Sequence, residues 1–335
     1  MNETGFRKHL RDRKLSEDQV NQHVAMMHRF EAFLGAGDPQ RTSRQPTGID
    51  ARDFSRLMMK EGLNTYENYL ALARHARFTE NHEVFIAFAE VIDGSEAMEV
   101  LHEKLGKTVG EGVRDGVFAG VALPPLGTPS SERYRITGVV MERLESMVDP
   151  QTCKKILSGG LRRLEGDWYL EEKRRFHECA DIDEYLDRRG REFIDELEQI
   201  KSKGALYYTQ PITDDVIGFV RSHPEIRQGV REGSVLYEVK IPYMAREYLA
   251  ETDPVMKRYY YCHCPWVRES LKGNDIAISP TFCHCSAGFH KKVWDVIFDQ
   301  PLEAEVVETV LRGDAWCKIA IHLPEAFGKA ANRPG

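Results

Sequence analysis

The spacing of hydrophobic residues changes along the chain, and this change limits the fold more than any other feature. Over residues 1–105 apolar side chains recur at helical spacing, and Ser16 with Gln19 predicts a capping box at one helix start. Residues 230–241 instead contain an Arg231-Glu232-Gly233 turn followed by the alternating run Val235–Ile241, which predicts a β-hairpin. We therefore expect an α+β protein, with an all-helical N-terminal domain followed by a mixed α/β domain with an antiparallel sheet.

The rest of the chain divides into three segments. Residues 106–135 are rich in glycine and proline and predict a linker. Residues 136–212 return to helical spacing and are expected to pack on the last domain, which we place at residues 213–325.

Three elements are expected inside that last domain. Tyr259-Tyr260-Tyr261 predicts a buried strand, and residues 289–298 predict an amphipathic helix. Residues 306–311 and 316–321 flank a Gly-Asp pair and predict a closing hairpin.

Composition narrows the class of protein. The chain has 335 residues, a net charge of −7 and 41% hydrophobic residues, which is enough to fill a core. No apolar run approaches the roughly 20 residues that cross a bilayer, so no membrane partner is expected. The seven cysteines are an odd number, and the first residues lack an apolar signal segment. We therefore expect a cytoplasmic protein whose cysteines bind metal or act as reactive thiols.

Two cysteine-histidine-cysteine tripeptides predict a chemical site. Cys262-His263-Cys264 and Cys283-His284-Cys285 form the pattern C-x-C-x18-C-x-C, which is near the zinc-ribbon pattern. Four thiolates suit Zn²⁺, or alternatively an iron–sulfur cluster. Residues i and i+2 of a strand lie about 6.6 Å apart, whereas sulfurs sharing one zinc lie about 3.8 Å apart. Both cysteines of a tripeptide can therefore bind one metal only at a turn, and Pro265 favours a turn at the first.

A reactive thiol is the other interpretation of the same residues. One thiolate would attack a C=N or C=O carbon, activated by a neighbouring histidine, either His284 or His290. The expected ligand pocket is lined by aromatic side chains, with plain core packing as the alternative for each: Tyr261, Trp266 and Phe289. The roles of Cys153 and Cys179, in the helical region, stay open.

The C-terminal segment resembles the end of the 4-vinyl-reductase-type domain, shared by bacterial aromatic-sensing regulators and vesicle-tethering subunits. The matching segments are Phe282-Cys283, Gly288-Phe289, Val306-Val307-Glu308 and Gly313-Asp314-Ala315-Trp316-Cys317. The resemblance implies an α/β domain with a zinc held by three cysteines. Cys283 and Cys317 match two of them, and Thr309 stands at the third position. Cys285, Cys264 or Cys262 would have to replace that ligand.

The same region is similar to the L-2-amino-thiazoline-4-carboxylic acid hydrolase family. The similarity lies in Cys264-Pro265-Trp266, Phe282-Cys283 and the segment from Gly313 to Cys317. It implies a small-molecule ligand, and hydrolysis of a small heterocyclic or amide-like substrate.

The N-terminal region resembles the SAM-like core-binding domain of phage integrases. The matching residues are Gln22, His28, Phe30, Phe33-Leu34 and the segment Gly62-Leu63-Asn64-Thr65. The resemblance implies DNA as a partner, and hence an alternative function as a DNA-associated sensor.

No His-x-x-Arg motif is followed by a credible nucleophilic tyrosine, so recombinase activity is not expected. Acidic residues also outnumber basic ones over residues 1–105, which gives this domain no overall positive charge for DNA. The sequence does not define an oligomeric state.

Overall fold

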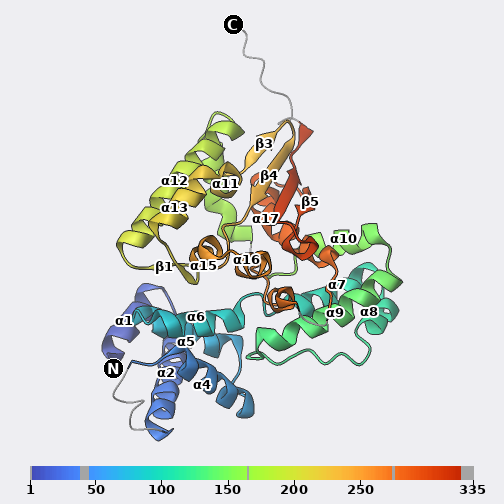
Figure 1. The fold of residues 1–335 in the computed structure, drawn as a ribbon. Coiled ribbons are helices and arrows are strands. Elements are labelled where there is room, and N and C mark those ends of the chain that lie inside the picture. Colours follow the sequence, from blue (N-terminus) through green and yellow to red (C-terminus); the bar gives the residue numbers. More distant parts are fainter. Residues whose placement is uncertain (1, 38–44, 164–165, 274–275, 326–335) are drawn as a thin grey trace. The chain divides into compact units, whose positions relative to one another are not determined.

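The computed structural model describes residues 2–37, 45–163, 166–273 and 276–325. The chain forms two compact units (Figure 1). The first unit comprises residues 1–95 together with 124–129, and the second comprises residues 96–123 and the chain from 130 onward. Each unit is described by itself below.

The first unit is all helical, as the sequence predicts. The predicted capping box is confirmed, because the Ser16 amide donates to the Gln19 side chain (3.0 Å) and the Gln19 amide donates to the Ser16 hydroxyl (3.3 Å). Apolar residues of helical spacing, such as Val20 and Phe30, are buried in the unit's core. Its helices are α1 (Glu3–Asp12), α2 (Glu17–Gly37), α4 (Gly48–Lys60), α5 (Tyr66–Phe78) and α6 (His82–Ile92).

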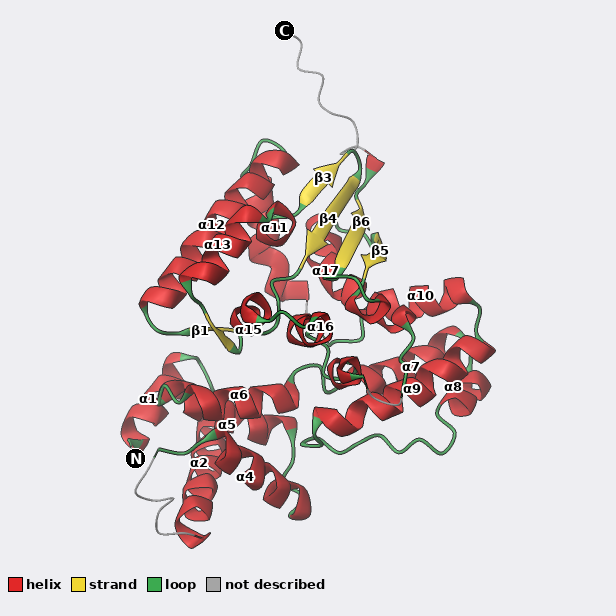
Figure 2. Cartoon of the chain, viewed as in Figure 1, coloured by secondary structure: helices red, strands yellow, loops and turns green. Residues whose placement is uncertain are grey.

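The second unit contains helices and all of the strands (Figure 2). Its longer helices are α7 (Ala97–Thr108), α8 (Glu111–Val117), α9 (Ser130–Met147), α10 (Pro150–Ser158), α11 (Leu170–His177), α12 (Ile182–Ser202), α13 (Asp214–Ser222), α16 (Pro254–Tyr261) and α17 (His284–Ile297). Its shorter helical segments are η1 (Gly166–Tyr169), α14 (Pro224–Arg227), α15 (Ala245–Ala250), η2 (Arg268–Lys272), η3 (Pro280–Cys283) and η4 (Val310–Arg312).

Residues 106–135, which the sequence predicts as a linker, contain α8 and the start of α9. Val117 of α8 is fully buried in the same core as Leu101 and Leu144. Most of this segment is therefore built into the second unit, because a short helix can bury an apolar face even where glycines interrupt it.

The main sheet has four antiparallel strands in the order β3-β4-β6-β5. Both expected hairpins are confirmed, since β3 pairs with β4 and β5 pairs with β6. Their predicted bounds are partly wrong, because Arg231 and Glu232 belong to β3 and not to the turn, and because the strand predicted over residues 306–311 ends at Glu308 and is followed by η4. The strand bounds are β3 (Val230–Glu232), β4 (Val235–Val239), β5 (Glu303–Glu308) and β6 (Lys318–His322). A separate two-stranded hairpin is formed by β1 (Leu206–Tyr207) and β2 (Gln210–Pro211).

The strand predicted at Tyr259-Tyr260-Tyr261 is wrong, because these residues end the helix α16. The helix begins at Pro254, and the Asp253 side chain caps it by accepting the Met256 amide at 2.8 Å. Three adjacent aromatic residues carry no period of their own, so the cap and the proline upstream decide the structure.

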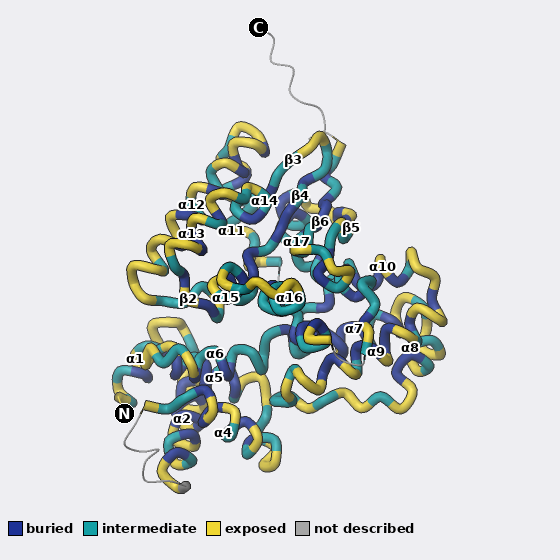
Figure 3. The backbone as a smooth tube through the Cα atoms, in the orientation of Figure 1, coloured by how far each residue is buried: buried dark blue, intermediate teal, exposed yellow. Residues whose placement is uncertain are grey.

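One face of the sheet packs on α17, which confirms the amphipathic helix expected over residues 289–298. Trp294 and Ile297 of α17 share a core with Leu236 and Ile319 of the central strands. Strand β4 is largely buried, while the outer faces of α12 and α13 are exposed (Figure 3). This packing decides which strand residues face α17, and it positions the site described next.

Candidate active site

Helix α17 lies in backbone contact with the end of α10. A Cβ atom added to Gly288 would stand 2.6 Å from the Ser158 carbonyl oxygen and 2.8 Å from the Gly160 nitrogen. Real Cβ atoms do not approach other atoms so closely, so this position requires glycine. The contact holds the segment that follows α10, including Arg162, beside α17.

The centre of the site is a bond between a histidine of α17 and a glutamate of the sheet. His290 Nδ1 lies 2.9 Å from Glu238 Oε2, and these two side chains are 10% and 8% exposed. Arg189 of α12 donates to Glu238 Oε1 at 2.8 Å, and the Trp294 indole donates to the same oxygen at 3.2 Å. Glu238 thus accepts three hydrogen bonds and has a positive partner, which is what a buried carboxylate needs.

The charges of these groups determine which nitrogen of the His290 imidazole carries the proton. Burial alone would raise the pKa of Glu238, but Arg189 and His290 lower it, and the resulting pKa is about 2. Burial lowers the pKa of His290, against the opposing effect of Glu238. A neutral imidazole bonded to a carboxylate must carry its proton on Nδ1, so Nε2 has the free lone pair.

Two cations lie next to this pair, on the ring of Phe289. The Lys240 Nζ atom is 4.7 Å from the ring centroid, and the guanidinium carbon of Arg162 is 5.4 Å from it. Lys240 also contributes, after burial, to the lowered pKa of His290. The positive charge of the site is therefore concentrated around Phe289, within reach of a group that develops negative charge.

Two thiols belong to the same site. Burial raises the pKa values of Cys264 and Cys285, and the charge of Arg162 opposes that shift in both. Each cysteine nevertheless keeps some accessible surface, as do Phe289 and Arg162. Phe289 and both thiols are thus neighbours of Arg162, and we call these four residues, with Lys240, His290 and Glu238, the His290 cluster.

The remaining predicted thiols gather around Thr309, which is fully buried. The Thr309 hydroxyl lies 3.1 Å from the Cys283 sulfur and 3.8 Å from the Cys317 sulfur. Burial and the nearby Cys317 raise the pKa of Cys262 to about 12. The three positions of the zinc pattern therefore lie close together, and the middle position carries a hydroxyl group where the pattern has a thiol. Among the described residues, no group of three or more His, Cys, Asp or Glu side chains is placed to hold a metal ion.

The other predicted site residues lie elsewhere. Tyr261 is buried, and its hydroxyl donates to backbone carbonyls of Lys240 (3.2 Å) and Cys317 (3.3 Å). Trp266 is also buried in the core. His284 bonds the Thr281 carbonyl through Nδ1 (3.0 Å), away from Glu238. The structure therefore places His290, Phe289, Cys264 and Cys285 in the His290 cluster and leaves these three residues outside it.

Cys153 and Cys179 do not belong to the His290 cluster. Cys153 is fully buried, and its sulfur lies 3.4 Å from the Val148 carbonyl oxygen. Cys179 is half-buried, 3.4 Å from the Arg175 carbonyl oxygen, and packs against the core that includes Phe176. Both cysteines are therefore packing residues.

Sequence reasoning missed the charged residues around His290, namely Glu238 and its partner Arg189, and Lys240 and Arg162. One signal was present: alternation in residues 235–239 places Glu238 on the same face as Leu236, which is apolar and buried. A carboxylate on the inward face of a strand indicates a partner of opposite charge.

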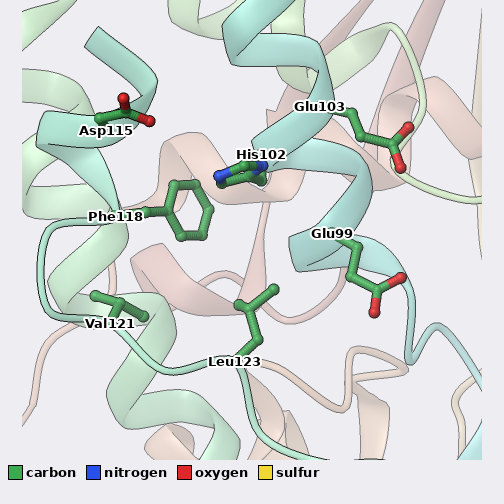
Figure 4. Close-up of a pocket in the computed structure, with 7 residues that line it drawn as sticks. All are labelled: Glu99, His102, Glu103, Asp115, Phe118, Val121 and Leu123. Atoms are coloured by element: carbon green, nitrogen blue, oxygen red, sulfur yellow. The ribbon is translucent and has the colours of Figure 1, made fainter. Parts of the chain in front are cut away.

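A hollow of the second unit lies between α7 and the segment that follows α8. It has a volume of about 510 Å³ and is lined by Glu99, His102, Glu103, Asp115, Phe118, Val121 and Leu123. The rings of His102 and Phe118 point toward one another with centroids 5.0 Å apart, while the carboxylates of Glu99 and Glu103 point away from them (Figure 4). Arg163 bonds Glu103 at 2.7 Å, so part of this acidic charge is already balanced.

Comparison of the chain with protein-family models, with curated proteins and with solved structures found no match. In the described part of the chain, no helix has the length and apolar character needed to span a membrane.

Proposed function

We propose that the second unit binds and hydrolyses a small molecule at the His290 cluster, with His290 as the general base. The observation that carries the proposal is the 2.9 Å contact of His290 Nδ1 with the buried carboxylate of Glu238. A carboxylate that holds one ring nitrogen orients the other toward substrate, and this arrangement serves general acid–base catalysis.

The reaction is hydrolysis at a C=O or C=N carbon. His290 Nε2 takes a proton from water while the water oxygen bonds to that carbon. Negative charge develops on the former carbonyl oxygen or imine nitrogen, where Lys240 and Arg162 stabilise it. The imidazolium then returns the proton to the leaving group, and that bond breaks. At a C=N carbon the nitrogen is the leaving group, and it also receives the proton of the newly added hydroxyl as the C–N bond breaks. Glu238 stays ionised and stabilises the transient positive charge on His290.

The thiols support a second route to the same products, in which Cys264 or Cys285 attacks the carbon. Burial raises the pKa values of both, so each is a neutral thiol at neutral pH. In the described part of the chain no cysteine sulfur is hydrogen-bonded to an imidazole nitrogen. Both facts favour water as the nucleophile.

Hydrolysis of p-nitrophenyl acetate tests the proposal. His290→Gln should lower kcat/KM by about 100-fold or more, because the base is lost. His284→Gln is the matched control and should leave the rate unchanged, since His284 lies on the same helix but bonds the Thr281 carbonyl and not Glu238. The rate of the wild type should fall as pH drops through the lowered pKa of His290, because protonation removes the lone pair. Equal rates for wild type and His290→Gln would refute the proposal. Loss of activity in Cys264→Ser alone would mean that the nucleophile is the Cys264 thiol and not water.

Zinc or an iron–sulfur cluster bound by the cysteines remains the other proposal for the thiols. The residues around Thr309 do not fit such a group as they are placed, since a hydroxyl lies between Cys283 and Cys317. No step of the mechanism therefore runs through a metal. Elemental analysis of protein purified without oxygen decides this point. Stoichiometric zinc or iron in the wild type, absent from Cys283→Ser, would establish a metal site.

A DNA-associated sensor is the second candidate function, favoured by one cluster in the first unit. Arg13 at the end of α1 lies close enough to Arg74 and Arg77 of α5 to add to the effect of burial in lowering their pKa values. Three neighbouring guanidinium groups suit a phosphate backbone. A gel shift with a mixed-sequence duplex should show binding that weakens from about 50 mM to about 200 mM salt and is reduced in Arg13→Ala. No shift at the lower salt concentration would refute this function.

A further inference from the structure

The hollow between α7 and the segment after α8 has no role in the proposed function. Its volume of about 510 Å³ is that of a small-molecule site. Phe118, Val121 and Leu123 give it an apolar surface, and Leu123 remains 36% exposed. Contact of these side chains with water is unfavourable, so a ligand with an apolar part gains free energy by covering them.

His102 lines the hollow beside Phe118. The two rings meet edge to face, with centroids 5.0 Å apart and an angle of 77° between their planes (Figure 4). Among the described residues, none donates a hydrogen bond to the His102 ring nitrogens or accepts one from them. Because His102 is only half-buried and its ring nitrogens are unbonded, one of them can accept a hydrogen bond from an N–H group of a ligand.

The charge of the hollow is negative. Glu99 and Glu103 are four residues apart and therefore lie on one face of α7, and Asp115 of α8 is the third carboxylate. Arg163 bonds Glu103 at 2.7 Å and Glu99 at 3.7 Å. Arg114 bonds Asp115 at 2.8 Å. Two arginines thus balance three carboxylates, and one negative charge remains for a ligand to compensate.

We infer that this hollow is a binding site for a small organic cation, namely a primary amine whose N–H group donates to His102 and whose apolar part packs on Phe118 and Leu123. The remaining negative charge favours a cation over an anion. An ammonium group next to the Phe118 ring also gains a cation–π attraction. The apolar side chains favour an organic cation over a metal ion, which needs several oxygen or nitrogen ligands. The inference is independent of the proposed hydrolysis at His290.

Calorimetric titration of the full chain with benzylamine tests the inference. Benzyl alcohol and benzoate have nearly the same shape, but at neutral pH benzylamine is a cation, benzyl alcohol is neutral and benzoate is an anion. Benzylamine should bind about tenfold more tightly than benzyl alcohol, and benzoate should bind most weakly. Added salt should weaken the binding of benzylamine and leave that of benzyl alcohol unchanged.

Substitutions locate the bound amine. Glu103→Gln removes one carboxylate and should weaken benzylamine binding about threefold without changing that of benzyl alcohol. Glu132→Gln changes an exposed carboxylate of α9 that does not line the hollow, so this matched control should bind both probes like the wild type. His102→Phe keeps a ring against Phe118 and should weaken benzylamine binding about fivefold. Benzyltrimethylammonium has no N–H group and should bind to His102→Phe as it does to the wild type, which also shows that this variant is folded.

Equal affinities of the wild type for benzylamine and benzyl alcohol, or no binding of benzylamine, would overturn the inference. Wild-type affinity for benzylamine in both Glu103→Gln and His102→Phe would also overturn it, because the amine would then bind elsewhere. His290→Gln should bind benzylamine like the wild type while losing ester hydrolysis. Benzylamine binding lost in His290→Gln would instead place the amine at the His290 cluster and reject the hollow as its site.

Discussion

The two units bury histidine in different ways. His75 of the first unit is buried on α5 against the Phe6 ring at 5.0 Å, and its Nε2 atom has no hydrogen-bond partner among the described residues. His290 of the second unit is equally enclosed, but Glu238 binds its Nδ1 atom. Burial lowers the pKa in both cases, to about 4 for His75.

The difference shows what a carboxylate adds to a buried imidazole. Burial alone makes the ring neutral and leaves its proton on whichever nitrogen the surroundings favour. A carboxylate chooses the tautomer, orients the ring and stabilises the charge that catalysis creates. His75 is therefore a packing residue, and His290 is placed to act as a base.

The largest expected effect comes from removing the charge of Glu238. Glu238→Gln keeps the shape of the side chain but leaves Arg189 without its countercharge, so the free energy of unfolding should fall by about 3 to 5 kcal/mol. All four tryptophans belong to the second unit, so urea denaturation followed by tryptophan fluorescence measures this loss.

His75→Leu supplies the contrasting variant. Because the buried ring nitrogen makes no hydrogen bond, an apolar replacement should leave the first unit as stable or make it more stable. Hydrogen exchange of α5 reports this unit. If Glu238→Gln were as stable as the wild type, the contrast between the two histidines would be lost.

Acid should weaken the first unit through His75. The unfolded side chain binds a proton below its ordinary pKa of 6.5, whereas the folded one does so only near 4. The unfolded state therefore binds more protons in that interval, and stability falls by about 1.4 kcal/mol per pH unit as pH decreases from 6.5 to 4.

The measurement is hydrogen exchange of α5 between pH 7 and pH 4.5, corrected for the intrinsic exchange rate. In His75→Leu, the decrease in the free energy of opening per pH unit should be smaller by the contribution of one proton. An unchanged slope would mean that His75 is protonated in the folded state.

A smaller effect is expected from the glycine that lets α17 approach α10. Gly288→Ala forces backbone atoms apart and should lower the free energy of unfolding by about 1 to 3 kcal/mol. Gly112 of α8 has open space around its added Cβ atom, so Gly112→Ala should be neutral or stabilising by up to about 1 kcal/mol. Thermal unfolding followed by tryptophan fluorescence compares the two, and an equal Tm for both variants would contradict the close contact at Gly288.

Local patterns could predict the elements of this fold but not the pairing of distant charges. The capping box at Ser16 and the alternation over residues 230–241 each depend on neighbours in sequence, and the structure confirms both. Tyr259-Tyr260-Tyr261 has no period, and there the strand prediction is wrong.

The residues of the candidate site could likewise be predicted only in part from sequence. His290 is a candidate from sequence because it neighbours the second cysteine tripeptide, whereas its partner Glu238 precedes it by 52 residues on a strand. The inward position of Glu238 depends on the strand register, which a single sequence leaves open.

The protonation state of His290 is the central claim, and nitrogen NMR of the histidine side chains measures it directly. At pH 7 the resonances of His290, assigned with His290→Gln, should show a neutral ring protonated on Nδ1, and Glu238→Gln should shift them. A ring protonated on Nε2, or on both nitrogens at that pH, would contradict the account.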